Sequence, residues 1–287
     1  MQFDLKGVAI AAAVTVTPAW AGHAQAAVYY TDFTASVTTE AITFPGQEVP
    51  PPETEDFYDG DSRENADVST LVDWSIHALW NGAGTASAGP GVVKFGMVSE
   101  VLRNLPDRQV TSLFMSGYAG ADENVSVAAA SGLETLEFTF RIDGTLAGAG
   151  AAMNAWGGTF TGYEYLTRYG SDTASIDEDF TFSVPVIDGR AMFSFYLGGS
   201  ASFFGGVGTE HAALDFTHTA KLTGLVGRDA TGGRVALTSV TGTGNADYLA
   251  IAAANAAVPE PASWAMMIAG FAVVGAAARR RPAIAYA

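Results

Sequence analysis

Hydrophobic and polar residues alternate along several stretches of this chain, as they do in a β-strand that has one buried face. Residues 136–142 alternate in this way and are followed by Asp143-Gly144, and residues 180–186 and 190–197 alternate on the two sides of Asp188-Gly189. An Asp-Gly pair between apolar runs is a strong turn signal. We therefore predict a strand that ends in a turn at 143–144 and a β-hairpin around 188–189.

The same period recurs elsewhere in the middle of the chain. Apolar residues occupy every second position from Val72 to Trp80, and Leu214, Phe216, Ala220 and Leu222 lie on one face together with His218. Many short strands separated by glycine-rich turns are typical of all-β domains. The sequence therefore predicts a mainly β fold, an antiparallel β-sandwich or a jelly-roll-like domain, with residues 27–257 as one β-rich passenger.

Two stretches depart from the alternating pattern. Pro50-Pro51-Pro52 opens an acidic segment that continues to Asp67, and this composition predicts a solvated loop. Apolar residues recur at helical spacing from Met97 to Leu105, just before Pro106. That spacing predicts one short helix at about 97–105.

The N-terminal residues have the pattern of a secretory signal peptide. Lys6 precedes an apolar stretch at 8–16, and Ala24-Gln25-Ala26 fits the small-x-small rule for cleavage before Ala27. Residues 1–26 are therefore predicted to direct export through the Sec machinery. An uncleaved membrane anchor is the alternative.

The C-terminal residues have the pattern of a membrane-held tail. Pro259 and Pro261 lack a backbone N–H, and Pro261 disfavours helical geometry at Glu260, so an extended and exposed segment is expected there. Residues 262–278 carry no charge and have the length of a short transmembrane helix. Arginines at 279–281 would keep that end in the cytoplasm, with Pro259 outside. The alternative is a buried C-terminal helix of a soluble fold.

This tail, at 258–287, resembles the PEP-CTERM sorting signal of Gram-negative bacteria, which exosortase membrane proteases process. The resemblance covers about a tenth of the chain and rests on these residues: Pro259, Glu260, Pro261, Trp264, Ala265, Met266, Met267, Gly270, Phe271, Gly275, Arg279, Arg280 and Arg281. It implies recognition at Pro259-Glu260-Pro261, cleavage nearby, and delivery to the cell surface or the extracellular polysaccharide matrix. The name "ice-binding protein C-terminal domain" is given to some such tails and describes the tail alone.

Charge and composition exclude some classes of binding partner and some kinds of chemistry for the passenger. The chain has a formal net charge of −16, and most of its acidic residues lie between the two ends. Such a surface repels nucleic acid and anionic lipid. The chain has no cysteine, which excludes disulfides, thiolate zinc sites and a thiol nucleophile.

No residue pattern in the passenger identifies a catalytic site. The sequence lacks a Gly-x-Ser-x-Gly elbow, a His-Glu-x-x-His helix, a Walker loop and a Rossmann fingerprint, so we expect a non-enzyme without a cofactor. Asp56, Asp59 and Asp61 are a candidate calcium site, with a merely solvated acidic segment as the alternative. A set of aromatic residues could stack on sugars, although their spacing favours packing within the fold: Trp74, Trp80, Trp156, Tyr163 and Tyr165.

Two functions remain open for the passenger. The first is a non-catalytic structural or adhesive component of the surface, biofilm or exopolysaccharide. The second is a polysaccharide-active hydrolase or glycan-binding module with an acidic and aromatic groove. A concave groove on one sheet face would favour the second function.

Overall fold

The computed structural model describes residues 26–41, 53–64, 68–76, 80–101, 108–148, 150–159, 161–170, 173–204 and 210–256. Residues 1–25 of the predicted signal peptide lie outside these ranges, and they include Ala24 of the predicted cleavage site. The whole predicted tail at 258–287 also lies outside them, with every sorting, anchor and stop residue named above. Within the described ranges, no helix has the length and apolar character needed to cross a membrane.

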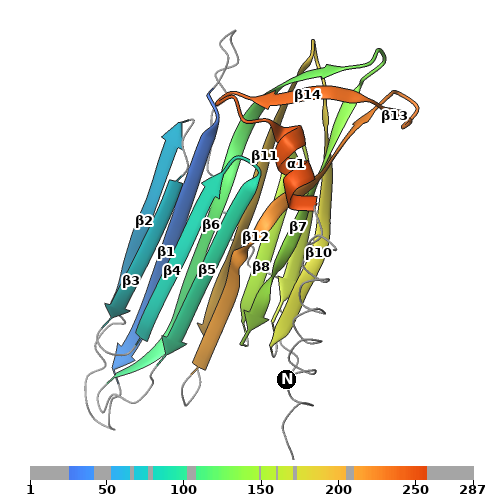
Figure 1. The fold of residues 1–287 in the computed structure, drawn as a ribbon. Helices are drawn as coiled ribbons and strands as arrows, with labels where there is room; N and C mark the ends of the chain where they lie inside the picture. The colour runs from blue at the N-terminus through green and yellow to red at the C-terminus, as the bar shows by residue number, and fades with distance from the viewer. Residues whose placement is uncertain are drawn as a thin grey trace, which may run out of the picture.

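The described part of the passenger consists of two seven-stranded antiparallel sheets and one helix (Figure 1). The first sheet has the order β2 (Glu53–Glu64), β1 (Val28–Ala41), β6 (Arg108–Ala129), β11 (Arg190–Phe204), β8 (Ala151–Thr159) and β9 (Gly162–Tyr169), with β14 (Leu237–Gly242) also paired to β6. The second sheet has the order β10 (Ala174–Pro185), β7 (Thr135–Ala147), β12 (Glu210–Arg228), β5 (Val92–Val101), β4 (Trp80–Gly89) and β3 (Val68–Ile76), with β13 (Arg234–Val235) paired to β12. The helix is α1 (Tyr248–Ala256).

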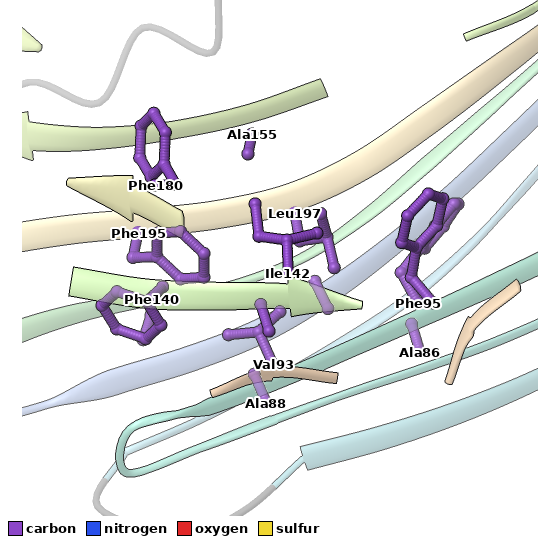
Figure 2. Close-up of a cluster of buried hydrophobic side chains, with 14 of the residues drawn as sticks. Ala86, Ala88, Val93, Phe95, Phe140, Ile142, Ala155, Phe180, Phe195 and Leu197 are labelled. Carbon is purple, nitrogen blue, oxygen red and sulfur yellow. The ribbon is translucent and has the colours of Figure 1, made fainter. Parts of the chain in front are cut away.

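The two sheets pack face to face over an aromatic core. Phe140 of β7 stacks on Phe195 of β11 with ring centroids 3.9 Å apart, and Phe33 of β1 stacks on Phe95 of β5 at 5.7 Å. Figure 2 shows Phe140, Phe195 and Phe180 converging from three strands. Aromatic pairs add about 0.5–1.5 kcal/mol to the free energy already gained by burying their area. The predicted β-sandwich is therefore confirmed, and its strands outnumber the roughly eight of a jelly roll.

The predicted alternation is confirmed in the core strands, but the turn at 143–144 is wrong. Leu136, Phe138, Phe140 and Ile142 are buried, and β7 continues through Asp143 and Gly144 to Ala147. Gly144 serves packing at this position, because a Cβ atom there would lie 2.3 Å from Cδ1 of Phe216. The glycine therefore makes room for a core ring inside a strand.

The predicted turn at Asp188-Gly189 forms, but the hairpin around it does not. Both residues have positive φ angles, 50° and 71°, and Ile187 and Arg190 exchange backbone hydrogen bonds of 2.8 and 3.0 Å. Beyond this turn β10 pairs with β7 in the second sheet, whereas β11 pairs with β6 and β8 in the first. β10 and β11 join different sheets because each strand has an apolar face that is buried between the two sheets.

The predicted helix at 97–105 and the predicted loop at 50–67 are both wrong where the structure describes them. Met97 to Val101 belong to β5, in which Met97 and Ser99 point inward while Val98 and Glu100 are exposed. Glu53 to Glu64 form β2, an edge strand paired with β1. Acidic residues are disfavoured in strands generally, but charged side chains are common on edges, where they discourage pairing with other chains.

The helix lies instead directly before the sorting tail, at the same end of the sandwich as the start of β1 (Figure 1). Asp247 caps it, with Oδ1 accepting a hydrogen bond of 3.1 Å from the backbone N–H of Ala250. Asn255 near the other end donates from Nδ2 to the carbonyl oxygen of Leu222 in β12 at 3.0 Å. Both ends of α1 are therefore held by hydrogen bonds.

A buried carboxylate joins the two ends of the described chain. Glu123 of β6 is 3% exposed, and its Oε2 accepts hydrogen bonds of 2.6 Å from the hydroxyls of both Tyr29 and Tyr248. Its Oε1 accepts from the backbone N–H and the hydroxyl of Thr243 at 3.2 and 3.1 Å. Burial, followed by the negative charge of Glu123, raises the pKa of Tyr248 well above its ordinary value. We call these four residues the Glu123 clamp.

We predict that Glu123→Gln destabilises the fold by about 1–3 kcal/mol, because an amide NH₂ would face hydroxyl donors inside a buried site. Glu100→Gln, on the exposed side of β5, is the matched control. Urea unfolding of both variants measures the effect. A Glu123→Gln protein as stable as the control would contradict the clamp.

Candidate functional site

The outward side of the first sheet carries a continuous row of aromatic residues. Tyr29, Thr31, Phe33 and Ala35 of β1 are buried against the second sheet, so the alternate residues Tyr30, Asp32 and Thr34 point outward. One row of register partners crosses the sheet from β2 to β9 and consists of Ser62, Tyr30, Gly120, Tyr196, Trp156 and Tyr165. We call the outward side of this sheet the aromatic face.

The rings of this row pack on one another and on glycine. Trp156 stacks on Tyr196 with centroids 3.6 Å apart, and Tyr30 lies 5.1 Å from Tyr196. A Cβ atom at Gly120 would lie 2.3 Å from Cδ1 of Tyr196, so only glycine leaves space for that ring. The stacked rings of the aromatic face are therefore part of the packing of the sheet itself.

Exposed apolar side chains are concentrated on the same face. Nine large hydrophobic residues are exposed in the described part of the chain, and six of them point outward from the first sheet: Tyr58, Phe114, Tyr163, Tyr165, Tyr169 and Met192. Tyr169 is 80% exposed and Tyr58 69%. Exposed apolar patches of this kind mark interaction surfaces.

Two half-buried carboxyl groups lie among the rings. Asp122 accepts hydrogen bonds from the hydroxyls of Ser194 and Tyr196, the latter at 2.9 Å, and a longer one of 3.4 Å from Tyr30. Asp32, one strand away, is hydrogen-bonded by Tyr58. Burial raises the pKa of both carboxyls above the ordinary value for aspartate, against the opposing effect of these hydroxyls.

The two carboxyls also influence the tyrosine that lies between them. Tyr118 of β6 is the register partner of Asp32 and lies four residues before Asp122. Burial first, and then the negative charges around the ring, raise the pKa of Tyr118 to about 12. The phenol therefore stays protonated and can donate a hydrogen bond at all physiological pH values.

The face is hollowed at the β2 end. A shallow hollow of about 330 Å³ is lined there by Thr34, Asp56, Tyr58 and Phe114, among others. It is apolar on balance, and its residues Thr34 and Tyr58 lie four positions along their strands from Tyr30 and Ser62 of the aromatic row.

The structure brings part of the predicted aromatic set together. Trp156, Tyr163 and Tyr165 share the aromatic face, and Tyr163 and Tyr165 are well exposed there. The prediction that these residues serve packing within the fold is therefore incomplete. Trp74 and Trp80 belong to β3 and β4 of the second sheet. Tyr30, Tyr118 and Tyr196 were not predicted, because only the pairing of distant strands places them beside Trp156.

The candidate calcium residues are separated by the strand in which they lie. Asp56 points to the aromatic face in register with Ser36, whereas Asp59 and Asp61 point to the opposite side of β2. Asp61 accepts a hydrogen bond of 3.0 Å from Nε of Arg63. No group of three or more potential metal-ligating side chains occurs within the described ranges.

Comparison with known proteins adds information about the end of the chain. Residues 257–281 match the family model of the PEP-CTERM protein-sorting motif. The chain carries a PEP-CTERM motif. It marks an exported protein whose C-terminal tail is membrane-anchored until an exosortase, itself a membrane protein, processes it. No curated protein matches this chain.

The motif begins where the described fold ends. Helix α1 ends at Ala256, and the matched residues of the PEP-CTERM motif start at position 257. The Glu123 clamp and Asn255 therefore hold the last helix of the passenger on the sandwich immediately before the sorting signal.

We predict that Asp122→Asn changes the pH dependence of stability. A raised pKa means that the folded carboxyl binds its proton more tightly than the unfolded one, so this contribution to stability is present below the ordinary pKa of 3.8 and is lost as pH rises through the raised value. The melting temperature of Asp122→Asn relative to wild type should therefore increase between about pH 3 and pH 7.

The control for this measurement is Asp143→Asn, at an exposed position of β7 in the second sheet. Thermal unfolding followed by circular dichroism at several pH values provides the comparison. An Asp122→Asn difference that falls with rising pH, or that matches the control throughout, would contradict the burial of a charge at Asp122.

Proposed function

We propose that this protein is a non-catalytic component of the cell surface or its polysaccharide matrix, and that its aromatic face binds glycan there. The sorting motif supports export and processing by an exosortase. The observation that carries the binding function is the row of rings from Tyr30 through Tyr196 and Trp156 to Tyr165.

The chemistry of the face suits sugar polymers. Pyranose rings have apolar faces that stack on aromatic side chains, and their edges bear hydroxyls that exchange hydrogen bonds with polar groups. The aromatic face supplies both kinds of contact, because serine, threonine and asparagine side chains lie between the rings. Tyr165 already donates to Oδ1 of Asn154 at 2.8 Å, which fixes the orientation of one such pair.

The geometry favours binding over hydrolysis. Asp32 is in register with Tyr118, and Asp122 lies four residues further along β6, which places the Cα atoms of the two aspartates roughly 14 Å apart along the strands. Glycoside hydrolysis uses two carboxyls separated by about 5–10 Å. The two acids with raised pKa are therefore better suited to holding a ligand than to cleaving one.

The position of the two ends of the described chain supports attachment at one end of the sandwich. Tyr29, just after the predicted signal cleavage site, and Tyr248, just before the sorting motif, donate to the same oxygen of Glu123. A tail anchored at that end would leave the aromatic face along the side of the body, open to polymer in the surrounding matrix.

We predict that Trp156→Ala weakens binding to polysaccharide extracted from the native host by about tenfold, since loss of one stacking contact costs about 1.4 kcal/mol. Affinity electrophoresis through gels that contain the polysaccharide measures this. Leu71→Ala is the matched control, because Leu71 is 81% exposed on the second sheet.

The expected result is unchanged migration of Leu71→Ala and faster migration of Trp156→Ala. Equal migration of the two variants would place any glycan site elsewhere. Release of reducing sugar by the wild-type protein would instead support the hydrolase alternative.

A further inference from the structure

The charge of the aromatic face narrows the class of glycan that it would bind. Asp32, Asp56 and Asp122 all point outward from the first sheet. Among the outward side chains described on that sheet, Arg190 is the one basic residue, and it lies at the first position of β11 in register with Ser126. That register position is four residues, or roughly 14 Å, from Asp122.

The two half-buried acids of the aromatic face differ in their partners from the arginine-paired carboxylates Glu137 and Glu178 of the second sheet. Glu137 is held by the guanidinium of Arg228, with contacts of 2.9 to 3.1 Å, and Glu178 by that of Arg168. Asp122 has Ser194, Tyr196 and Tyr30 as partners instead, and Asp32 has Tyr58. All of these donors are neutral hydroxyls, so the negative charges lack a compensating cation within the described chain.

Aromatic rings surround these charges. Tyr30 and Tyr196 each donate a hydrogen bond to Asp122, and their ring centroids lie 5.1 Å apart. Tyr118 lies 6.0 Å from both rings and between the two acids in register. Carboxylates next to tyrosine rings attract an ammonium group in two ways, through charge pairing and through cation–π contact.

We propose that the ligand of the aromatic face is a cationic polysaccharide with free amino groups, an amino-sugar polymer whose ammonium groups pair with Asp122 and Asp32. This inference rests on the proposed function, because the sugar rings of that polymer would stack on Trp156 and its neighbours. Its ammonium groups supply the positive charge that the two acids lack.

The other charge classes of polysaccharide fit this face less well. A polyuronate or a phosphorylated polymer would bring negative charge against Asp32, Asp56 and Asp122 and would be repelled. A neutral glucan could stack on the rings but would leave the two carboxylates unpaired, and its binding would not depend on Asp122. The effect of replacing Asp122 on binding therefore distinguishes a cationic polysaccharide from a neutral one.

The test uses the processed protein released by the native host and three soluble polymers: chitosan with free amines, hydroxyethyl cellulose as a neutral glucan, and alginate as a polyuronate. Because a polycation attracts any acidic protein, each acid variant is compared with Asp143→Asn, which removes the same charge from the second sheet. Affinity electrophoresis at about 0.15 M salt limits long-range attraction.

We expect chitosan to bind, with Asp122→Asn and Asp32→Asn each weakening the interaction by about tenfold and Asp143→Asn by less than about twofold. The two acid variants lie on separate strands, so a folding defect in one of them would not explain weaker binding in both. Binding to hydroxyethyl cellulose should be weaker and insensitive to Asp122→Asn.

Two results would overturn the inference while leaving the proposed function standing. One is tight binding of hydroxyethyl cellulose that depends on Trp156 and is unaffected by Asp122→Asn. The other is an equal loss of chitosan binding in Asp122→Asn and Asp143→Asn, which would reveal only diffuse charge attraction. Absence of binding to all three polymers and to the host polysaccharide would overturn both proposals together.

Discussion

The strict alternation of inward and outward side chains along β1, β6 and β11 is the constraint on which both the core and the surface depend. Phe33 and Phe195 point inward and stack across the sheets, while Asp32 and Tyr196, one residue before or after them, point outward. A register slip of one residue would bury Asp32 and expose Phe33. The free energy of core packing therefore also fixes the aromatic face in place.

The adjacent residues Asp122 and Glu123 show how one strand serves two purposes. Glu123 points inward, accepts four hydrogen bonds and joins the two ends of the described chain. Asp122 points outward into a half-buried site where burial raises its pKa, which is unfavourable for a charged group at neutral pH. A surface residue that lowers the stability of the fold in this way is typical of a binding site.

The strands of the core could be predicted from the sequence because period-two alternation depends on local residues alone. The aromatic face could not, since Tyr30 meets Gly120 and Tyr196 meets Trp156 only after strands far apart in the sequence have paired. Edge position explains the unexpected strand β2, and the space needed by Phe216 explains why Gly144 is not a turn. The sorting signal was evident because its function lies in a short linear motif.

Hydroxyl-radical footprinting of the processed protein, with and without polysaccharide from the native host, tests the central claim most directly. The account predicts protection of the exposed tyrosines of the first sheet, Tyr58, Tyr163, Tyr165 and Tyr169, with no change at Leu71 and Val98 on the second sheet. Protection at Leu71 and Val98, or at none of these residues, would contradict a glycan-binding function for the aromatic face.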